Sequence, residues 1–201
     1  MAAFRGNLIV ISGPSGAGKS TVVNKAIAGR NDICFSTSVT TRKPRPGEID
    51  GREYFFVEPD DFKTMVEEGK LLEHAEYVAN SYGTPKAFVE EKLNEGINVL
   101  LDIEVQGAAQ INEKMPDCVK VFIIPPSLEE LERRLVSRNT DTPRAIEARL
   151  IRARQEYGMA DFYDYIIIND DADAAAAELS AIITAQKCRN QLRKECLIIS
   201  E

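Results

Sequence analysis

The residues from Gly13 to Thr21, GPSGAGKST, satisfy the pattern G-x-x-x-x-G-K-[ST] of a phosphate-binding loop. Glycines let such a backbone wrap closely around phosphate oxygens, and a helix that starts just after it offers its unpaired N–H groups to the anion. In such a loop the lysine, here Lys19, bridges the β- and γ-phosphates, and the hydroxyl of Ser20 binds Mg²⁺. The pattern therefore predicts a nucleoside triphosphate site made of Gly13, Ser15, Gly16, Ala17, Gly18, Lys19, Ser20 and Thr21.

A carboxylate suited to organising the metal follows in the stretch INVLLDIE. Asp102 ends its apolar part, and Glu104 comes two residues later. Taken alone, Asp102 could equally be an acid that faces water at the end of a strand. P-loop enzymes, however, commonly hold their metal with an acid at such a position. Beside an intact phosphate-binding loop, we therefore expect Ser20 and Asp102 to hold Mg²⁺ together.

A second cationic feature lies between Ser38 and Phe56, in SVTTRKPRPGEIDGREYFF. Four cations, Arg42, Lys43, Arg45 and Arg52, stand close together in a chain whose formal net charge is -7. One interpretation is a solvated basic loop. The other is a pocket for a small anion, because arginine binds phosphate oxygens in pairs.

These residues must be positioned by an α/β fold. Short apolar runs rich in β-branched residues alternate with stretches of helical spacing, which indicates a parallel sheet flanked by helices. The expected strands are Leu8 to Ile11, Ile97 to Leu101, Val119 to Ile124 and Tyr165 to Ile168. Expected helix starts are Thr84 as an N-cap before Pro85, a capping box formed by Ser127 and Glu130, and Thr142 before Pro143; a last helix covers about Asp173 to Leu192.

Two segments depart from this alternation, and we expect both to be parts of one domain. Residues of about 35–83 read as a small mixed α+β insertion, with its own little sheet and one short helix near Phe62. The arginine-rich residues of about 137–154 read as a short lid. The remaining core then comprises about 1–34, 84–136 and 155–201.

Composition excludes several classes of protein. The length of 201 residues, 44% of them hydrophobic, suits one core with insertions. A pI near 5.0 argues against nucleic acid as a partner. Four cysteines without a C-x-x-C pair and a single histidine give no zinc-binding spacing, and no apolar run could cross a membrane. We expect a cytoplasmic protein without an obligatory protein partner.

The phosphate-binding loop alone does not define the reaction. A GTPase would need an N-K-x-D motif to read its base, but Asn24 and Lys25 are followed by Ala26 and Ile27. A kinase of small molecules needs an acceptor site opposite the loop and a way to exclude water, and the insertion and the lid could provide both.

From this loop almost to the C-terminus, the chain resembles the guanylate kinases. The matching stretches, in order, are GPSGAGKST, SVTTRKPRPGEIDGREYFF, LLEHAEY, SYGTP, LDIEVQG, SRNTDTPRAIEARL and IIINDD. The resemblance implies Mg²⁺-dependent transfer of the γ-phosphoryl group of ATP to GMP, and to dGMP, in purine nucleotide metabolism.

The resemblance also implies roles for individual residues on the acceptor side. Ser38 and Glu73 would select guanine, because a glutamate accepts both N–H donors of its pairing edge while a serine donates to its carbonyl. Arg42, Arg45, Tyr54 and Tyr82 would hold the phosphate of GMP. Thr84, Asp102 and Glu104 complete the implied GMP site. Where many relatives read D-I-D this chain has Glu104, which leaves the role of that residue open.

On the donor side, Arg138 and Arg149 match lid arginines that fold over the ATP phosphates, where positive charge stabilises the transferring group. Lys19, Asp102, Arg138 and Arg149 are thus the expected catalytic residues. Asn169 lies in the region that contacts adenine in related kinases. The neighbouring arginines are expected to pair with acids along their helices, and these are Arg134, Arg144, Arg152 and Arg154.

Two other interpretations compete with this one. A guanylate-kinase-like module could have lost catalysis and bind phosphorylated peptides, but the intact Lys19 and Ser20 argue against it. A kinase of similar build could take AMP or a deoxynucleotide. The pair Ser38 and Glu73 favours guanine.

Overall fold

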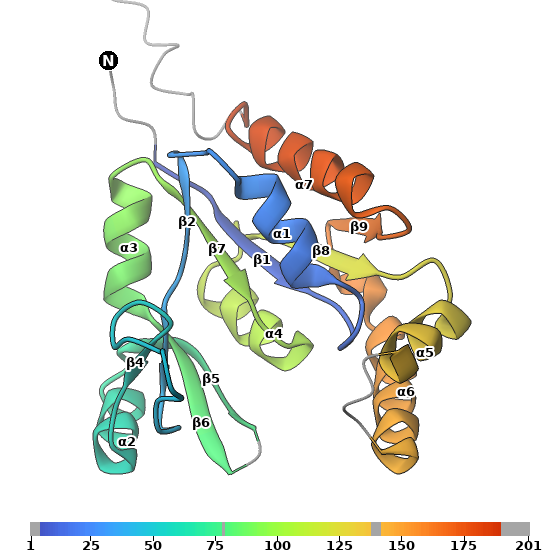
Figure 1. The fold of residues 1–201 in the computed structure, drawn as a ribbon. Coiled ribbons are helices and arrows are strands. Elements are labelled where there is room, and N and C mark those ends of the chain that lie inside the picture. Colours follow the sequence, from blue (N-terminus) through green and yellow to red (C-terminus); the bar gives the residue numbers. More distant parts are fainter. Residues whose placement is uncertain (1–4, 78, 138–141, 190–201) are drawn as a thin grey trace, which may run out of the picture.

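The computed structural model describes residues 5–77, 79–137 and 142–189, and a parallel sheet of five strands forms its centre (Figure 1). The strand order is β2-β7-β1-β8-β9, and every neighbouring pair is parallel. All four predicted strands are confirmed. The sheet also contains the short edge strand β2, which the sequence pattern did not predict. The five strands are β1 (Leu8–Ser12), β2 (Ile33–Phe35), β7 (Asn98–Asp102), β8 (Val119–Ile124) and β9 (Tyr165–Ile168).

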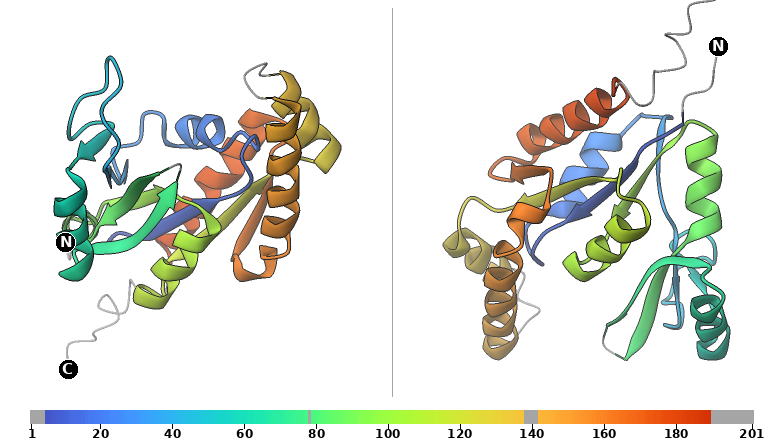
Figure 2. Two further views of the ribbon diagram at one scale, coloured as in Figure 1. Left: turned by 90° about the horizontal axis from the view of Figure 1, so that it is seen from below. Right: turned by 180° about the vertical axis from the view of Figure 1, so that it is seen from behind.

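Helices cover both faces of this sheet, because successive residues of a strand point to opposite sides. Ile9 and Ile11 pack toward α1 (Lys19–Ile27) and α7 (Ala172–Gln186). Leu8 and Val10 pack toward α3 (Lys86–Asn94) and α4 (Val105–Lys114). Figure 2 shows the three resulting layers from two further directions. The predicted fold class, a parallel sheet between helices, is therefore confirmed.

The insertion forms a second sheet of four strands in the order β4-β3-β6-β5. Strand β3 pairs in parallel with β4 and antiparallel with β6, so the sheet contains both strand directions. Val39, Phe62 and Leu71 form a small core of its own. Its elements are β3 (Ser38–Thr40), β4 (Tyr54–Phe56), α2 (Pro59–Glu67), β5 (Leu71–Tyr77) and β6 (Asn80–Pro85).

Two helices, α5 (Leu128–Ser137) and α6 (Pro143–Tyr157), pack against each other beside the main sheet. Thr142 caps α6 as predicted, since its hydroxyl accepts from the backbone N–H of Ala145. Ser127 likewise accepts from the N–H of Glu130 at 3.1 Å. The carboxylate of Glu130 does not complete the expected box, because it accepts from arginines of its own helix. A short 3₁₀ helix, η1 (Ala160–Phe162), leads into β9.

Two predicted helix boundaries need correction. Thr84 is not an N-cap: it lies in β6, Pro85 takes the cap position and α3 begins at Lys86. The hydroxyl of Thr84 donates to the carboxylate of Glu73 instead. The last helix begins at Ala172 and ends at Gln186, and residues 190–192 of the predicted helix lie outside the described residues. Within the described ranges, no helix is both long and apolar enough to cross a bilayer.

Candidate active site

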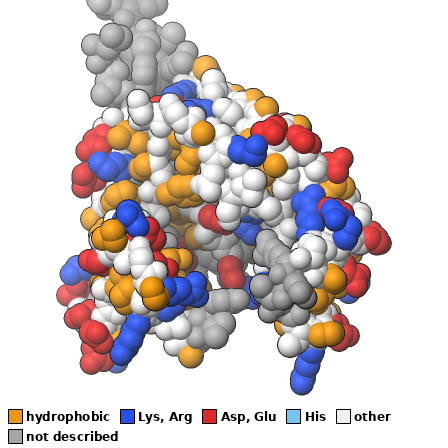
Figure 3. Space-filling view, in the orientation of Figure 1, with side chains coloured by type: hydrophobic (Ala, Val, Ile, Leu, Met, Phe, Trp, Pro, Cys, Tyr) orange, Lys and Arg blue, Asp and Glu red, His pale blue; other side chains and the backbone are white. Residues whose placement is uncertain are grey.

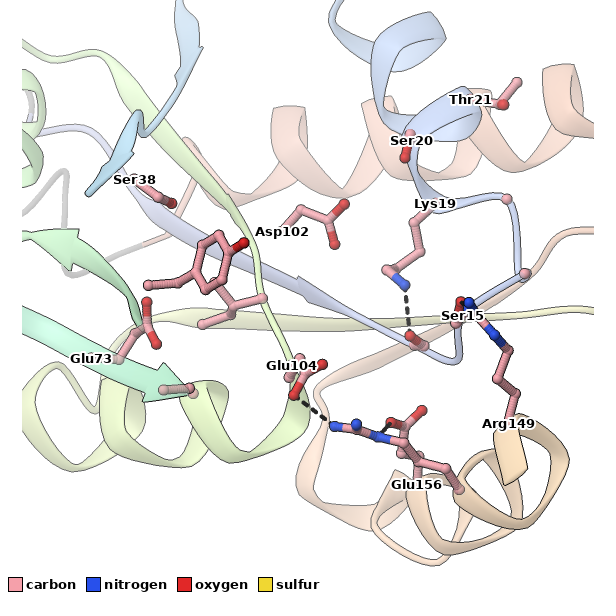
Figure 4. A pocket seen from close by; sticks show the side chains of 18 of the residues that line it. Ser15, Lys19, Ser20, Thr21, Ser38, Glu73, Asp102, Glu104, Arg149 and Glu156 are labelled. Atoms are coloured by element: carbon pink, nitrogen blue, oxygen red, sulfur yellow. Dashed lines mark hydrogen bonds and ion pairs between the residues drawn. The ribbon is translucent and has the colours of Figure 1, made fainter. Parts of the chain in front are cut away.

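A cavity of about 690 Å³ opens at the carboxyl ends of β1 and β7. It is the hollow between the insertion and the α5–α6 pair in Figure 3. Figure 4 shows Glu73 and Ser38 on one side of it, Lys19 and Ser20 on the other, and Asp102 between them. The predicted residues that line it are Gly13, Ser15, Gly16, Gly18, Lys19, Ser20, Thr21, Ser38, Tyr54, Glu73, Tyr82, Asp102, Glu104 and Arg149.

The phosphate-binding loop has a backbone that requires glycine. Gly13 has a φ of 147°, and a Cβ there would lie 2.0 Å from the carbonyl oxygen of Ile123. Gly18, the N-cap of α1, has a φ of 86° and carries no capping side chain. The first N–H groups of α1 are therefore left to an anion in the cavity. The Nζ of Lys19 donates to the carbonyl oxygen of Gly13 at 2.6 Å, which holds the ammonium group at the loop.

Two side chains brace the loop from behind. Asn169 is buried, and its Nδ2 donates to the carbonyl oxygen of Ala17 at 2.7 Å. Arg134 donates to the carbonyl oxygens of Asn169 at 2.9 Å and of Ala17 at 3.4 Å. We expected both Asn169 and Ala17 at the nucleotide site, but neither residue lines the cavity. Arg134 pairs with Glu130, as expected, but its contact with the loop was missed because the residues are far apart in the sequence.

Acids and arginines face each other across the middle of the cavity. Burial raises the pKa of Asp102, and the charge of Lys19 opposes that rise. Arg152 donates to Glu104 at 2.6 Å and to Glu156 at 3.0 Å, so it joins α6 to the residue before α4. Arg152 and Glu156 also line the cavity, and we did not predict either there. Arg149 donates to the hydroxyl of Ser15. Arg138 lies outside the described residues.

The oxygens of Ser20 and Asp102 suit a hard cation. Mg²⁺ is usually bound by one or two protein oxygens together with substrate phosphates and water. In the described ranges, no group of three or more His, Cys, Asp or Glu side chains could hold a metal ion alone. The pair therefore fits a metal that arrives with a nucleotide.

The acceptor side of the cavity contains a buried carboxylate. Glu73 is 5% exposed, and the hydroxyl of Thr84 donates to its Oε1 at 2.7 Å. Burial raises the pKa of Glu73. The hydrogen bond from Thr84 and the charge of Lys114 partly oppose this rise. Gly107 gives its Oε2 room, because a Cβ there would lie 2.9 Å from that oxygen. Thr84 does not line the cavity, so it orients Glu73 from behind.

The basic loop is organised by an acid that sequence reasoning missed. Arg42 donates to both carboxylate oxygens of Glu48, at 2.9 and 3.0 Å, and the backbone N–H of Arg45 donates to the same group at 2.7 Å. The guanidinium of Arg42 also lies 5.3 Å from the ring centroid of Tyr54. Neither Arg42 nor Arg45 lines the cavity here. Lys43 and Arg52 are exposed.

The fold and the site together define a P-loop nucleotide kinase, in which the phosphate-binding loop lines one side of a cavity and the buried Glu73 lines the other. The comparisons specify this class further. The family model described as guanylate kinase matches residues 5–186, and the chain belongs to the guanylate kinase family. This confirms the resemblance inferred from the motifs.

Named relatives are similar over most of their length. A guanylate kinase of Lactococcus lactis subsp. lactis (strain IL1403) is 50% identical over 92% of this chain and 90% of its own. One of Clostridium perfringens (strain SM101 / Type A) is 46% identical over 98% of this chain and 91% of its own. A crystal structure of guanylate kinase from Anaplasma phagocytophilum matches with a TM-score of 0.74 at 35% identity, covering 98% and 97% of the two chains.

Proposed function

We propose that this chain catalyses the Mg²⁺-dependent transfer of the γ-phosphoryl group of ATP to GMP, and to dGMP. ATP-dependent phosphorylation of GMP is the reaction of the guanylate kinase family, to which the chain belongs. The observation that carries the proposal is the single cavity in which Lys19 of the phosphate-binding loop faces the buried Glu73. We further propose that the reaction takes place in the cytoplasm and needs no other protein.

On the donor side, the loop from Gly13 to Thr21 holds the phosphates of ATP. Lys19 then moves its donor hydrogens from its own loop carbonyl to the β- and γ-phosphates. Arg149, already beside Ser15, and Arg138 of the lid add positive charge around the transferring group. The side chain of Asn169 keeps the loop in place, and the region of the chain around it contacts the adenine.

On the acceptor side, Glu73 accepts two N–H donors of guanine, and Ser38 donates to its carbonyl. Arg42 and Arg45, with the hydroxyls of Tyr54 and Tyr82, bind the phosphate. Thr84 orients Glu73. Asp102 and Glu104 lie between Glu73 and Lys19 in Figure 4, and would therefore lie between the two bound nucleotides.

The reaction joins a phosphate oxygen of GMP to the γ-phosphorus of ATP. The bond from that phosphorus to the bridging oxygen breaks, and ADP leaves with its electron pair. Ser20 and Asp102 would hold Mg²⁺, which would neutralise part of the negative charge of the phosphates. The chain's own groups position the two nucleotides and exclude water.

Exclusion of water gives the insertion and the lid their roles. We propose that residues of about 35–83 close over GMP and that residues of about 137–154 close over ATP, each moving against the core. Arg42 and Arg45, which lie outside the cavity wall here, would enter it in that closure. Closure strengthens the electrostatic interactions inside the site and denies the phosphoryl group to water.

Glu48 tests how the phosphate of GMP is bound. We expect Glu48→Gln to raise the KM for GMP several-fold and to leave the KM for ATP unchanged, because Arg42 loses its bidentate carboxylate partner. Initial rates at varied GMP measure this. Glu53→Gln is the matched control, since Glu53 pairs with the exposed Arg52 in the same loop. A lower KM in Glu48→Gln would mean that Glu48 competes with the phosphate for Arg42.

The assignment itself is tested by ADP formation from ATP and Mg²⁺ with GMP, dGMP, AMP, UMP or no acceptor. ADP formation with GMP and dGMP alone is the expected result. ADP formation with AMP or UMP, and not with GMP or dGMP, would support a kinase activity but contradict the role of Ser38 and Glu73 in selecting guanine. Silence with every acceptor, in a folded protein, would favour a module that binds phosphorylated peptides.

A further inference from the structure

Helix α4 of the core lies along the open edge of the acceptor sheet. Strand β5 is an edge strand, paired with β6 on one side only. On its other side, the Nε2 of Gln110 donates to the carbonyl oxygen of His74 at 3.0 Å, and the N–H of His74 donates to the Oε1 of Gln110 at 3.1 Å. The side-chain amide of Gln110 thus replaces the backbone of a missing neighbouring strand.

A second residue of α4 makes a similar contact one turn later. The Nζ of Lys114 donates to the carbonyl oxygen of Leu71 at 3.1 Å. Between these two contacts, the pairing of β5 with β6 shifts register, from Leu71 opposite Pro85 to His74 opposite Gly83. A register shift of this kind turns a side chain away from its regular direction. Gln110 and Lys114 therefore hold β5 on both sides of the irregular segment that contains Glu73.

The same helix also fixes the other end of the cavity. Glu104 is the N-cap of α4, and Asp102 ends the strand before it. Gly107, in the first turn, approaches Glu73 closely enough that a Cβ would meet its Oε2 at 2.9 Å. Figure 4 shows Glu73 beside this helix and Glu104 at its start. Helix α4 is thus a rigid element that sets where the Glu73 carboxylate lies relative to Asp102 and Glu104.

We propose that Gln110 is a positioning residue that determines selectivity for guanine, because it fixes the backbone next to Glu73 to the core. This proposal rests on the proposed function. Gln110 does not line the cavity. It acts through Glu73, whose carboxylate must meet two donors of the base at once, so a small displacement costs affinity for GMP and not for ATP.

The test is Gln110→Met, which keeps the length of the side chain and removes both hydrogen bonds. We expect the KM for GMP to rise about tenfold and the preference for GMP over AMP to fall, with the KM for ATP unchanged. Gln106→Met is the matched control, because Gln106 is an exposed residue of the same helix. Thermal unfolding of each variant is measured alongside, since lost stability alone does not alter the KM for one substrate.

A double-mutant cycle with Glu73→Gln decides whether Gln110 acts through Glu73. We expect Gln110→Met to change the KM for GMP by less than about threefold in the Glu73→Gln background. The same tenfold rise in both backgrounds, or wild-type kinetics in Gln110→Met, would overturn the proposal. If Gln110→Met does not fold, Gln110→Glu retains the acceptor for the His74 N–H, loses the donor, and should raise the KM for GMP likewise. Absence of GMP-dependent ADP formation in the wild type would overturn the proposed function instead.

Discussion

Replacing Lys19 by alanine is expected to lower kcat with GMP by about a thousandfold. The Nζ of Lys19 is held at the phosphate-binding loop by the carbonyl oxygens of Gly13 and Pro14, at 2.6 and 3.4 Å. Its charge is therefore at the loop before ATP arrives, and its donor hydrogens turn from these carbonyl oxygens to the phosphates as ATP binds. No further reorganisation is needed as negative charge develops on the γ-phosphoryl group. The measurement is the initial rate of ADP formation at saturating ATP and GMP.

The control for this variant is Lys25→Ala. Lys25 belongs to the same helix, α1, and its Nζ pairs with Asp173 at the surface, so its loss removes a lysine without touching the cavity. We expect wild-type kcat in the control and unchanged thermal unfolding in both variants. Near-normal kcat in Lys19→Ala would exclude Lys19 from the chemistry and would shift the role of charge stabilisation to Arg149 and Arg138.

Local patterns in the sequence predicted the main sheet and the phosphate-binding loop well. Runs such as Val119 to Ile124 are apolar throughout because both faces of a parallel strand are covered. The loop is equally legible, since its glycines are required by the backbone itself, as the φ of 147° at Gly13 illustrates. The short edge strand β2 was missed, because three residues carry no recognisable period.

Contacts between distant segments could not be predicted in this way. The sequence gives no sign that Thr84 would donate to Glu73 rather than cap a helix, because the choice depends on the pairing of β5 with β6. Arg134 behind the loop and Gln110 on β5 are further examples. Glu48 was within reach of sequence reasoning, since a cluster of cations in a closed loop needs an acid to orient it, and this one follows Arg45 by three residues.

The second large effect is expected at the guanine pocket. We expect Glu73→Gln to raise the KM for GMP about tenfold to a hundredfold and to leave the KM for ATP within about twofold. An amide must turn one donor toward a donor of guanine, and little water reaches Glu73, which is 5% exposed, to relieve the mismatch. Initial rates at varied GMP and fixed ATP measure the change. Glu76→Gln, at an exposed position of the same strand, is the control.

Comparing the KM for GMP of the wild type and of Glu73→Gln at several pH values distinguishes the effect of the charge of Glu73 from the effect of its shape. Burial raises the pKa of Glu73, and only the ionised carboxylate can accept both donors of guanine. The KM for GMP of the wild type should therefore rise as the pH falls toward this raised pKa, and recover above it. The phosphate of GMP also gains a proton near pH 6, but it does so equally in Glu73→Gln, so the ratio of the two KM values isolates Glu73. A ratio that does not change with pH would mean that Glu73 binds guanine without its charge.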